Sequence, residues 1–309
     1  NVLSEVSAIT ECINPLVECE VSGAPVSVAT IDPYAAALDL ARNFAGTQNT
    51  DWQPFAYTFP DDPVAAPMVL VPVGSFQMGS PDGVGEDDEH PMHTQTFSEP
   101  FWIDQTEVTR AQYGLCVSAG ACSETPASDY STRDTQPINR VTWFQSRDYC
   151  AWRAEVTGDA YRLPQKREWE YAARGVENWV YPWGNNDPTA DRAVYGGLSE
   201  ISDVGSKSPA GDSWVGAQDL SGNVWEWVNT IYGVDLNAPY NFGDTGERLY
   251  SYPYVADDGR ETDSENSTGV RVRRGGSFGN YSYAVRGAYR IWYTPTNEYF
   301  DIGFRCARS

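Results

Sequence analysis

The pattern of hydrophobic and polar residues predicts a chain with few long regular elements. Residues 68–80, MVLVPVGSFQMGS, are apolar enough for a buried strand followed by a hairpin return. Elsewhere, long stretches are rich in Gly, Pro, Asn, Asp and aromatic residues and have no regular period. We therefore expect a loop-rich fold that disulfides and rigid aromatic rings hold together more than long helices and strands do.

Two stretches have the features of longer helices. Residues 141–158 begin with Thr142 in the N-cap position and have Gly158 just past the predicted end. Residues 163–175 place Pro164 in the first turn, where its missing N–H is harmless. These two helices are the clearest regular elements that the pattern predicts.

The first part of the chain differs from the rest. Residues 24–32, APVSVATID, alternate in the manner of a strand, and residues 33–46 predict a short helix that ends at Gly46. We interpret residues 1–61 as an N-terminal extension and residues 62–309 as one domain. The strand-like run is suited to an arm that pairs with a neighbouring subunit, so we expect self-association, if any, to use residues 1–45.

Charge narrows the choice of partners. The chain of 309 residues has 43 acidic and 21 basic residues and a net charge of −22. Such a chain repels nucleic acid and anionic membranes, and no apolar run approaches the ~20 residues of a membrane span. Acidity of this kind is typical of a solvated surface, and it is also compatible with Ca²⁺ binding.

The six cysteines indicate an oxidising compartment. None has the CxxC spacing of a zinc site, and they can be grouped as pairs: Cys12 with Cys19, Cys116 with Cys122, and Cys150 with Cys306. The first residues lack the basic-then-apolar pattern of a signal peptide. We expect an exported protein whose signal has been removed, located outside the cell, on its surface or in the periplasm.

Two other features resemble catalytic sites but lack essential parts. His90 and His93 lie among acidic residues at 85–93, but Pro91 prevents a helix that would align them. Without a third histidine, neither a three-histidine iron centre nor a hydrolytic zinc site can be assembled, so we expect a solvated acidic loop. Ser277 follows two glycines, but no histidine lies where a catalytic partner would be.

The segment 278–300 is unusually aromatic, with eight Phe, Tyr or Trp among its 23 residues. Tyr and Trp interspersed with Ser, Gly and Asn are typical of a binding surface, in which rigid rings provide area and small polar groups provide hydrogen bonds. A strand packed in the core is the alternative. The candidate ligand-binding residues are Asn280, Tyr281, Tyr283, Trp292, Tyr293, Asn297 and Tyr299.

An ordered series of segments resembles the formylglycine-generating enzyme (sulfatase-modifying factor) family. The series is MVLVPVGSFQMGS, FWIDQTEVTRAQY, PINRVTWFQSRDYCAW, YRLPQKREWEYAARG, YPWG, DLSGNVWEWV, RRGGSF and IGFRCA, spread over residues 68–307. The resemblance implies a C-type-lectin-like α+β fold that is loop-rich, with a twisted, mostly antiparallel sheet, two flanking helices and a site on long loops.

The resemblance also implies a chemistry that this sequence lacks. Enzymes of that family bind Cu(I) through two cysteines just after the RGGS motif, and residues 278–290 contain none. Cu(I) is a soft ion that needs thiolates, so we expect no copper. Cys306 matches the family's structural cysteine near the C-terminus, which makes Cys150 its expected partner.

The resemblance further implies calcium. Asp219, Gly222, Val224 and Glu226 match positions at which the family binds Ca²⁺ through two side chains and two backbone carbonyls, an all-oxygen set that suits this ion. The alternative is a turn with exposed acids. A second calcium site of the family would fall at 190–206, where the spacing is shortened and Asp191 stands in place of the usual Asn.

Three functions remain open at this stage. The first is an exported, calcium-stabilised, non-catalytic protein that binds a protein or glycan through residues 278–300, a segment that is also similar to the diversified region of variable proteins of diversity-generating retroelements. The second is an oxidoreductase of the family with its chemistry elsewhere. The third is a structural subunit of an extracellular assembly or filament.

Overall fold

The computed structural model describes residues 32–197, 200–234, 250–262 and 269–309. The chain divides into two compact units, Asn1–Pro33 and Tyr34–Ser309, and all described residues except Asp32 and Pro33 belong to the second. The predicted Cys12–Cys19 pair and, apart from Asp32, the predicted strand at 24–32 lie outside the described residues.

One antiparallel sheet crosses the unit and joins segments far apart in sequence. Its order is β1 (Ala56–Thr58), β2 (Pro67–Val71), β5 (Phe101–Asp104), β11 (Ala307–Arg308) and β6 (Tyr161–Arg162). β2 is buried along almost its whole length, as its apolar sequence predicts. The C-terminal strand β11 therefore lies between β5 and β6 and ties the end of the chain into the sheet.

A second sheet carries the candidate site. Its order is β10 (Ile302–Phe304), β7 (Trp225–Val234), β8 (Gly269–Arg274) and β9 (Arg290–Tyr293), with β10 parallel to β7 and the other pairs antiparallel. A separate pair is formed by β3 (Gly74–Met78) and β4 (His93–Phe97). The predicted hairpin return within 68–80 is therefore wrong, because β2 pairs with β1 and β5 while β3 pairs with β4.

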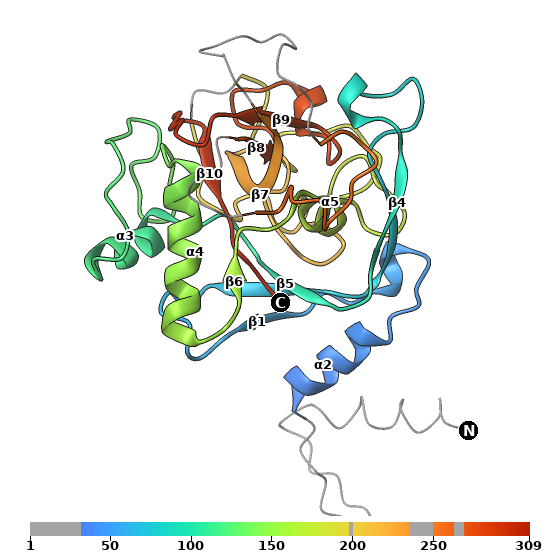
Figure 1. Ribbon diagram of the computed structural model, residues 1–309, viewed down its shortest axis with the longest axis horizontal. Coiled ribbons are helices and arrows are strands. Elements are labelled where there is room, and N and C mark those ends of the chain that lie inside the picture. The colour runs from blue at the N-terminus through green and yellow to red at the C-terminus, as the bar shows by residue number, and fades with distance from the viewer. Residues whose placement is uncertain (1–31, 198–199, 235–249, 263–268) are drawn as a thin grey trace, which may run out of the picture. The chain divides into compact units, whose positions relative to one another are not determined.

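Four α-helices are found among the described residues: α2 (Pro33–Arg42), α3 (Arg110–Ser118), α4 (Trp143–Thr157) and α5 (Lys166–Arg174). Figure 1 shows α4 beside β6 and α5 close to β7 and β8, and the same elements are in contact. Short 3₁₀ turns occur at Asn49–Asp51, Asp87–Glu89 and Ser282–Val285. None of the helices in these ranges is long and apolar enough to cross a membrane.

The helix ends follow local capping rules. Thr142 accepts a hydrogen bond from the N–H of Gln145 at 3.1 Å, and Gly158 ends α4 in the left-handed region with φ of 77°, which confirms the predicted caps. α5 begins later than predicted, because Gln165 is its N-cap and Pro164 lies before it.

The compact unit begins before the predicted boundary at 61/62. Ala41, Trp52 and Phe59 are buried in the main core, so residues 34–61 belong to the same unit as the rest. α2 ends at Arg42 and not at Gly46.

A buried ion-pair network and a disulfide hold the core beneath the C-terminal strands. Arg153 of α4 binds Asp62 at 2.7 Å and Asp104 at 2.8 Å, and Asp104 also accepts the N–H of Cys306. Cys306 is bonded to Cys150, and Cys116 is bonded to Cys122, so both predicted pairs in the described residues are confirmed.

Candidate functional site

The chain turns sharply after β8, where the candidate ligand segment begins. Gly275 and Gly276 have φ of 88° and 72°, and a Cβ on Gly276 would lie 2.7 Å from the carbonyl oxygen of Ala284. Glycine is the residue that satisfies both the conformation and the space at this turn. The RGGS motif is therefore a backbone requirement of the site.

Ser277 and Asn280 close this turn on itself. Asn280 Oδ1 accepts the backbone N–H of Ser277 at 2.9 Å and the Ser277 hydroxyl at 2.8 Å, and Asp301 Oδ2 lies 3.1 Å from that hydroxyl. The hydroxyl is buried and engaged with these polar groups, which makes Ser277 an anchor of the loop. The amide oxygen of Asn280 is likewise used by the scaffold.

Two predicted ligand residues point their rings outward. Tyr281 is 65% exposed and Tyr283 is 53% exposed, which is high for aromatic residues on a structured loop. Phe300 and Tyr130 are also exposed, and their rings stack with centroids 4.6 Å apart. Tyr130 was not predicted, because it lies almost 150 residues before the aromatic segment and nothing in its local pattern indicates the contact.

The other predicted rings are partly packed. Trp292 stacks on Tyr232 of β7 with centroids 3.7 Å apart, and Tyr293 meets Tyr299 edge to face at 5.3 Å. Trp292, Tyr293 and Tyr299 are half-buried against the core. Asn297 is half-buried in a turn. The segment 278–300 thus combines the two predicted roles, exposed surface and packed strand.

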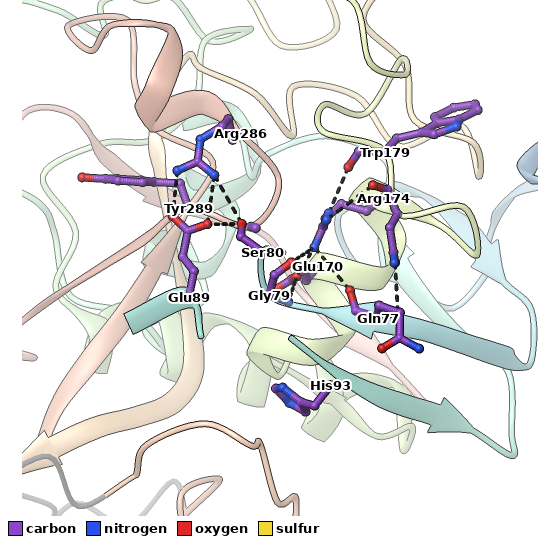
Figure 2. Close-up of polar contacts among 12 residues, drawn as sticks. Gln77, Gly79, Ser80, Glu89, His93, Glu170, Arg174, Trp179, Arg286 and Tyr289 are labelled. Atoms are coloured by element: carbon purple, nitrogen blue, oxygen red, sulfur yellow. Dashed lines mark hydrogen bonds and ion pairs between the residues drawn. The ribbon is translucent and has the colours of Figure 1, made fainter. Parts of the chain in front are cut away.

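An ion pair fixes the exposed loop to the acidic loop at 85–93. Arg286 binds Glu89 through two bonds, Nη2 to Oε1 at 2.7 Å and Nη1 to Oε2 at 2.9 Å, and Ser80 also bonds to Glu89 (Figure 2). Burial would raise the pKa of Glu89, but the bonds from Arg286 and Ser80 outweigh it and lower that pKa. The acidic loop is therefore part of the structure around the site.

A second buried carboxylate supports the opposite side of this region. Glu170 of α5 accepts bonds from Arg174 at 2.6 Å and from the N–H of Gly79 at 2.8 Å (Figure 2). It also accepts a bond from Arg274 of β8. Two arginines keep the pKa of Glu170 low although its burial acts to raise it. The bond between Arg274 and Glu170 therefore fixes the end of β8 to α5.

Glu107, Asp219 and Glu226 form a buried acidic cluster. Arg305 pairs with Glu226 through two bonds, Nε to Oε2 at 2.7 Å and Nη2 to Oε1 at 2.8 Å, and Trp169 donates to the same carboxylate at 2.8 Å. Glu107 accepts from the side chain of Asn223 at 3.1 Å.

The cluster brings three carboxyl groups close to one arginine, Arg305. Burial raises the pKa of Asp219 to about 6, and burial together with Asp219 and Glu226 raises the pKa of Glu107 well above its ordinary value. A divalent cation near these groups would favour their charged forms. Carboxylate and carbonyl oxygens are the ligands that Ca²⁺ prefers.

The calcium set would need the backbone as well as side chains. No group of three or more His, Cys, Asp or Glu side chains within the described ranges is placed to hold a metal. Asp219 and Glu226 would have to be joined by the carbonyls of Gly222 and Val224, as the resemblance implies. Glu226 already binds Arg305, which fixes its carboxylate but leaves it fewer free lone pairs.

The predicted second calcium segment does not bring acids together in its described part. Asp191 is exposed in a turn, and Asp203 pairs with Arg133 at 2.9 Å. Residues 198–199 of this segment lie outside the described residues.

Thiol chemistry does not fit this structure. The four cysteines within the described ranges are all in disulfides, and the turn after β8 is built from Gly, Ser, Phe and Asn. Cu(I) therefore finds no thiolate ligand there.

His93 has a structural environment in which backbone groups bond to both ring nitrogens. His93 Nδ1 lies 2.8 Å from the carbonyl of Pro91, and its Nε2 accepts the N–H of Tyr254 at 2.8 Å. Burial lowers the pKa of His93, because the charged ring would be desolvated. Such a neutral ring, bonded to backbone on both sides, suits a loop anchor.

Sequence reasoning missed Glu107 and Arg305 as members of the acidic cluster. Glu107 lies among mostly polar residues in the segment FWIDQTEVTRAQY, whereas Arg305 stands among apolar neighbours in IGFRCA. The position of Arg305 was a signal of burial, but no spacing rule connects either residue with Asp219 or Glu226.

Comparison with known proteins supports the resemblance over most of the chain. A model of the sulfatase-modifying factor enzyme 1-like domain matches residues 56–309. The formylglycine-generating enzyme of Thermomonospora curvata is 28% identical over 305 residues, with 79% of this chain and 94% of that protein covered. A Bos taurus protein named inactive C-alpha-formylglycine-generating enzyme 2 is 27% identical over 303 residues, with 78% and 87% covered.

Solved structures show the same fold. PvdO from Pseudomonas aeruginosa aligns with a TM-score of 0.63 and 26% identity, over 84% of this chain and 99% of that one. Treponema denticola variable protein 1 aligns with a TM-score of 0.58 and 21% identity, over 83% and 99%. The predicted α+β, formylglycine-generating-enzyme-like fold is confirmed, and the predicted likeness to variable proteins is confirmed at the level of the fold.

Proposed function

The chain belongs to the sulfatase-modifying factor enzyme 1-like family, and we propose that it is a non-catalytic member that binds a protein or glycan ligand. The ligand would meet the rings of Tyr281, Tyr283, Phe300 and Tyr130. One observation carries this proposal: the turn after β8 presents exposed tyrosines and no cysteine.

The absence of thiols from this turn argues against the family's oxidase chemistry. Ser277 and Asn280 bond to each other where the loop leaves β8, and neither supplies a soft ligand for copper. The Bos taurus relative shows that proteins named inactive occur among the similar sequences. An oxidoreductase with its chemistry elsewhere is the alternative that the experiment below separates.

The exposed rings suit recognition. Tyrosine contributes a rigid ring and a hydroxyl at small entropic loss, and Tyr and Trp are enriched among residues that dominate binding energy. The loop that carries Tyr281 and Tyr283 is held by the Arg286–Glu89 ion pair and by the turn at Ser277. Rings on a preorganised loop lose less entropy on binding than rings on a mobile one.

Calcium belongs to the same proposal as a structural ion. Asp219 and Glu226 would supply carboxylate oxygens, and Gly222 and Val224 would supply backbone carbonyls, to an ion that favours the charged forms of the buried carboxyl groups. The ion would stabilise residues 219–226 and would take no part in catalysis.

Export is the location that the disulfides favour. Two disulfides are present in the described residues, and disulfides persist in oxidising compartments. We therefore place the protein outside the cell, at its surface or in the periplasm.

Self-association stays a separate proposal. Residues 1–45 were the predicted arm, but Ala41 is fully buried in the core of the second unit, so a deletion that tests the arm should end at residue 31. Removal of residues 1–31 should leave a folded chain and abolish any oligomer seen by size-exclusion chromatography. An unchanged oligomer would exclude the arm.

Two measurements test the proposed function. Incubation of the protein with a CxPxR peptide, copper and O₂ should leave the peptide unchanged in mass spectrometry, and an aldehyde product would refute the non-catalytic proposal. Peptides selected from display libraries on the native protein should lose binding to a Tyr281→Ser/Tyr283→Ser variant. Ligands that bind both proteins equally would show that the face is not the binding site.

A further inference from the structure

A pocket lies away from the aromatic face and beside the first residues of the second unit. Its volume is about 720 Å³, which is within the usual range for small-molecule sites. It is lined by residues from three separate stretches, 49–56, 179–192 and 209–216, and by Val69 and Gln105. No residue of 278–300 lines it, so the pocket is distinct from the proposed ligand face.

Tryptophan dominates the lining. Four of the chain's 11 tryptophans contribute to it: Trp52, Trp179, Trp183 and Trp214. Trp214 is buried and donates its indole N–H to the carbonyl of Tyr171 at 2.9 Å. Trp52 is also buried and packs edge to face against Phe44. These two rings form a fixed apolar base.

The other two rings are partly exposed. Trp183 lies parallel to Tyr181 with centroids 5.2 Å apart and donates its indole N–H to the carbonyl of Asn186 at 3.0 Å. Trp179 is held through its backbone, whose carbonyl accepts from Arg174 at 2.9 Å (Figure 2). The aromatic lining is therefore preorganised, which reduces the entropy lost when a ligand binds.

Polar groups at the pocket have unused hydrogen-bonding capacity. Arg192 has no carboxylate partner among the described residues, and its guanidinium lies 5.9 Å from the ring centroid of Trp183. Asp212 is half-buried, and its Oδ2 accepts from the hydroxyl of Ser208 at 2.8 Å; a carboxylate oxygen can accept more than one hydrogen bond.

The donors and acceptors at the pocket indicate which chemical class of ligand it can bind. A guanidinium can only donate and a carboxylate can only accept, so a ligand that bonds to both Arg192 and Asp212 must accept and donate. Hydroxyl groups do both. A neutral ligand is favoured, because the pocket has one acid beside one base and the whole chain has a net charge of −22 that repels anions.

We propose that this pocket binds a carbohydrate. The C–H face of a pyranose ring would pack on the partly exposed tryptophan rings, and its hydroxyls would bond to Asp212 and Arg192. The pocket is in part outside the family match, which begins at residue 56, because Asn49, Trp52 and Pro54 contribute to its wall. The binding is a second activity of this chain, independent of the proposed ligand face.

The test uses the full chain with isosteric variants. A printed array of plant, bacterial and animal oligosaccharides identifies the retained glycan, and calorimetry with its soluble form measures affinity. Asp212→Asn exchanges an acceptor for a donor at constant shape, and Arg192→Gln removes the cation. Because hydrogen bonds to charged groups are strong, each change should weaken glycan binding by about 10- to 100-fold.

Matched controls exclude general effects. Asp203→Asn and Arg133→Gln alter an exposed acid–base pair that does not line the pocket, and both should bind the glycan as the native protein does. The Tyr281→Ser/Tyr283→Ser variant should also retain glycan binding, which separates this inference from the proposed function. Retention of no glycan on the array, or equal affinity of the native protein and both pocket variants, would overturn the proposal.

Discussion

Phe278 donates its backbone N–H to the carbonyl oxygen of Asn223 at 2.9 Å. This bond joins the first residue of the aromatic segment to the loop that carries the acidic cluster. A second backbone bond, from the N–H of Gly222 to the carbonyl of Gly275 at 2.8 Å, lies beside it. The geometry of the exposed loop therefore depends on how firmly residues 219–226 are held.

The first prediction concerns calcium at that loop. If Asp219 and Gly222 help to bind Ca²⁺, saturating calcium should raise the melting temperature by several degrees over chelated protein, since an ion at 100 times its Kd stabilises by about 2.7 kcal/mol. Asp219→Gly should abolish the difference. Glycine suits this site because Asp219 has φ of 58°, in the left-handed region.

Glu226 is the wrong residue for this test. Its carboxylate is fully buried and paired with Arg305, so Glu226→Gln would leave an arginine without its partner and destabilise the fold for a reason unrelated to calcium. A melting temperature of the native protein that does not respond to chelator would identify residues 219–226 as an ordinary turn.

The second prediction compares the two disulfides. Cys150–Cys306 closes a loop with a sequence separation of 156, whereas Cys116–Cys122 spans only 6. In the chain-entropy model the long loop is worth about 5 kcal/mol and the short one about 2 kcal/mol. Urea unfolding of the two double Cys→Ala variants should show the larger loss for Cys150/Cys306. Equal losses would indicate that local packing, and not loop closure, sets the effect.

Local rules predicted the helices well, and non-local contacts explain most of what they missed. Thr142 and Gly158 cap α4 through bonds within one turn, so the sequence contains the whole signal. β2 and β3 are neighbours in sequence, but their partners β5 and β4 are not encoded by any turn between them. An apolar run alone cannot show which strand lies beside it.

The same limit applies to the sites. The composition of the sequence indicated the aromatic segment. It could not show that Trp292 stacks on Tyr232 of another strand, with ring centroids 3.7 Å apart. In the acidic cluster Glu107 lies close to Asp219 in space, although the two residues are more than 100 positions apart in the sequence. Tryptophans of the pocket come from positions as distant as 52 and 214, and no pattern in the chain connects them.

A third prediction uses the Arg286–Glu89 pair. The Glu89 side chain is fully buried and that of Arg286 is 13% exposed, so the two single changes should differ. Arg286→Gln leaves a buried carboxylate without its cation and should cost about 3–5 kcal/mol in urea unfolding. Glu89→Gln lets the arginine turn to solvent and should cost about 1 kcal/mol.

The double variant provides the control for this asymmetry. Arg286→Gln/Glu89→Gln should be about as stable as Glu89→Gln alone, because no buried charge remains unpaired. If Arg286→Gln were no more harmful than Glu89→Gln, the carboxylate would have to be solvated in the native protein.

A fourth prediction concerns pH. Burial lowers the pKa of His93 below its usual 6.5, so the unfolded chain takes up a proton first as pH falls. Stability from the neutral ring is therefore full above pH 6.5 and declines below it. Glu170 favours the charged ring, while Lys166 and Arg290 oppose it.

The difference between native protein and His93→Gln isolates this effect. Burial raises the pKa of Asp219 to about 6, so its contribution has the opposite pH dependence and decreases as pH rises. Asp219 is present in both proteins, so its contribution cancels in the difference. Melting curves should therefore show the native protein losing stability relative to the variant as pH falls from neutral towards 5. Parallel curves would place His93 in a solvated environment.

The last prediction separates recognition from packing within the aromatic segment. Tyr281 and Tyr283 are largely exposed, so replacing both by Ser should change the free energy of unfolding by less than about 0.5 kcal/mol. Trp292 and Tyr293 pack on β7 and on Tyr299, so the same replacement there should cost at least about 2 kcal/mol. Binding should follow the opposite order. Because exposed tyrosines dominate such interfaces at about 2 kcal/mol or more each, the Tyr281/Tyr283 variant should bind a ligand selected on the native protein at least about 30-fold more weakly, by calorimetry, with circular dichroism unchanged. If this variant unfolds, its rings are core, and the ligand face must be sought elsewhere on the protein.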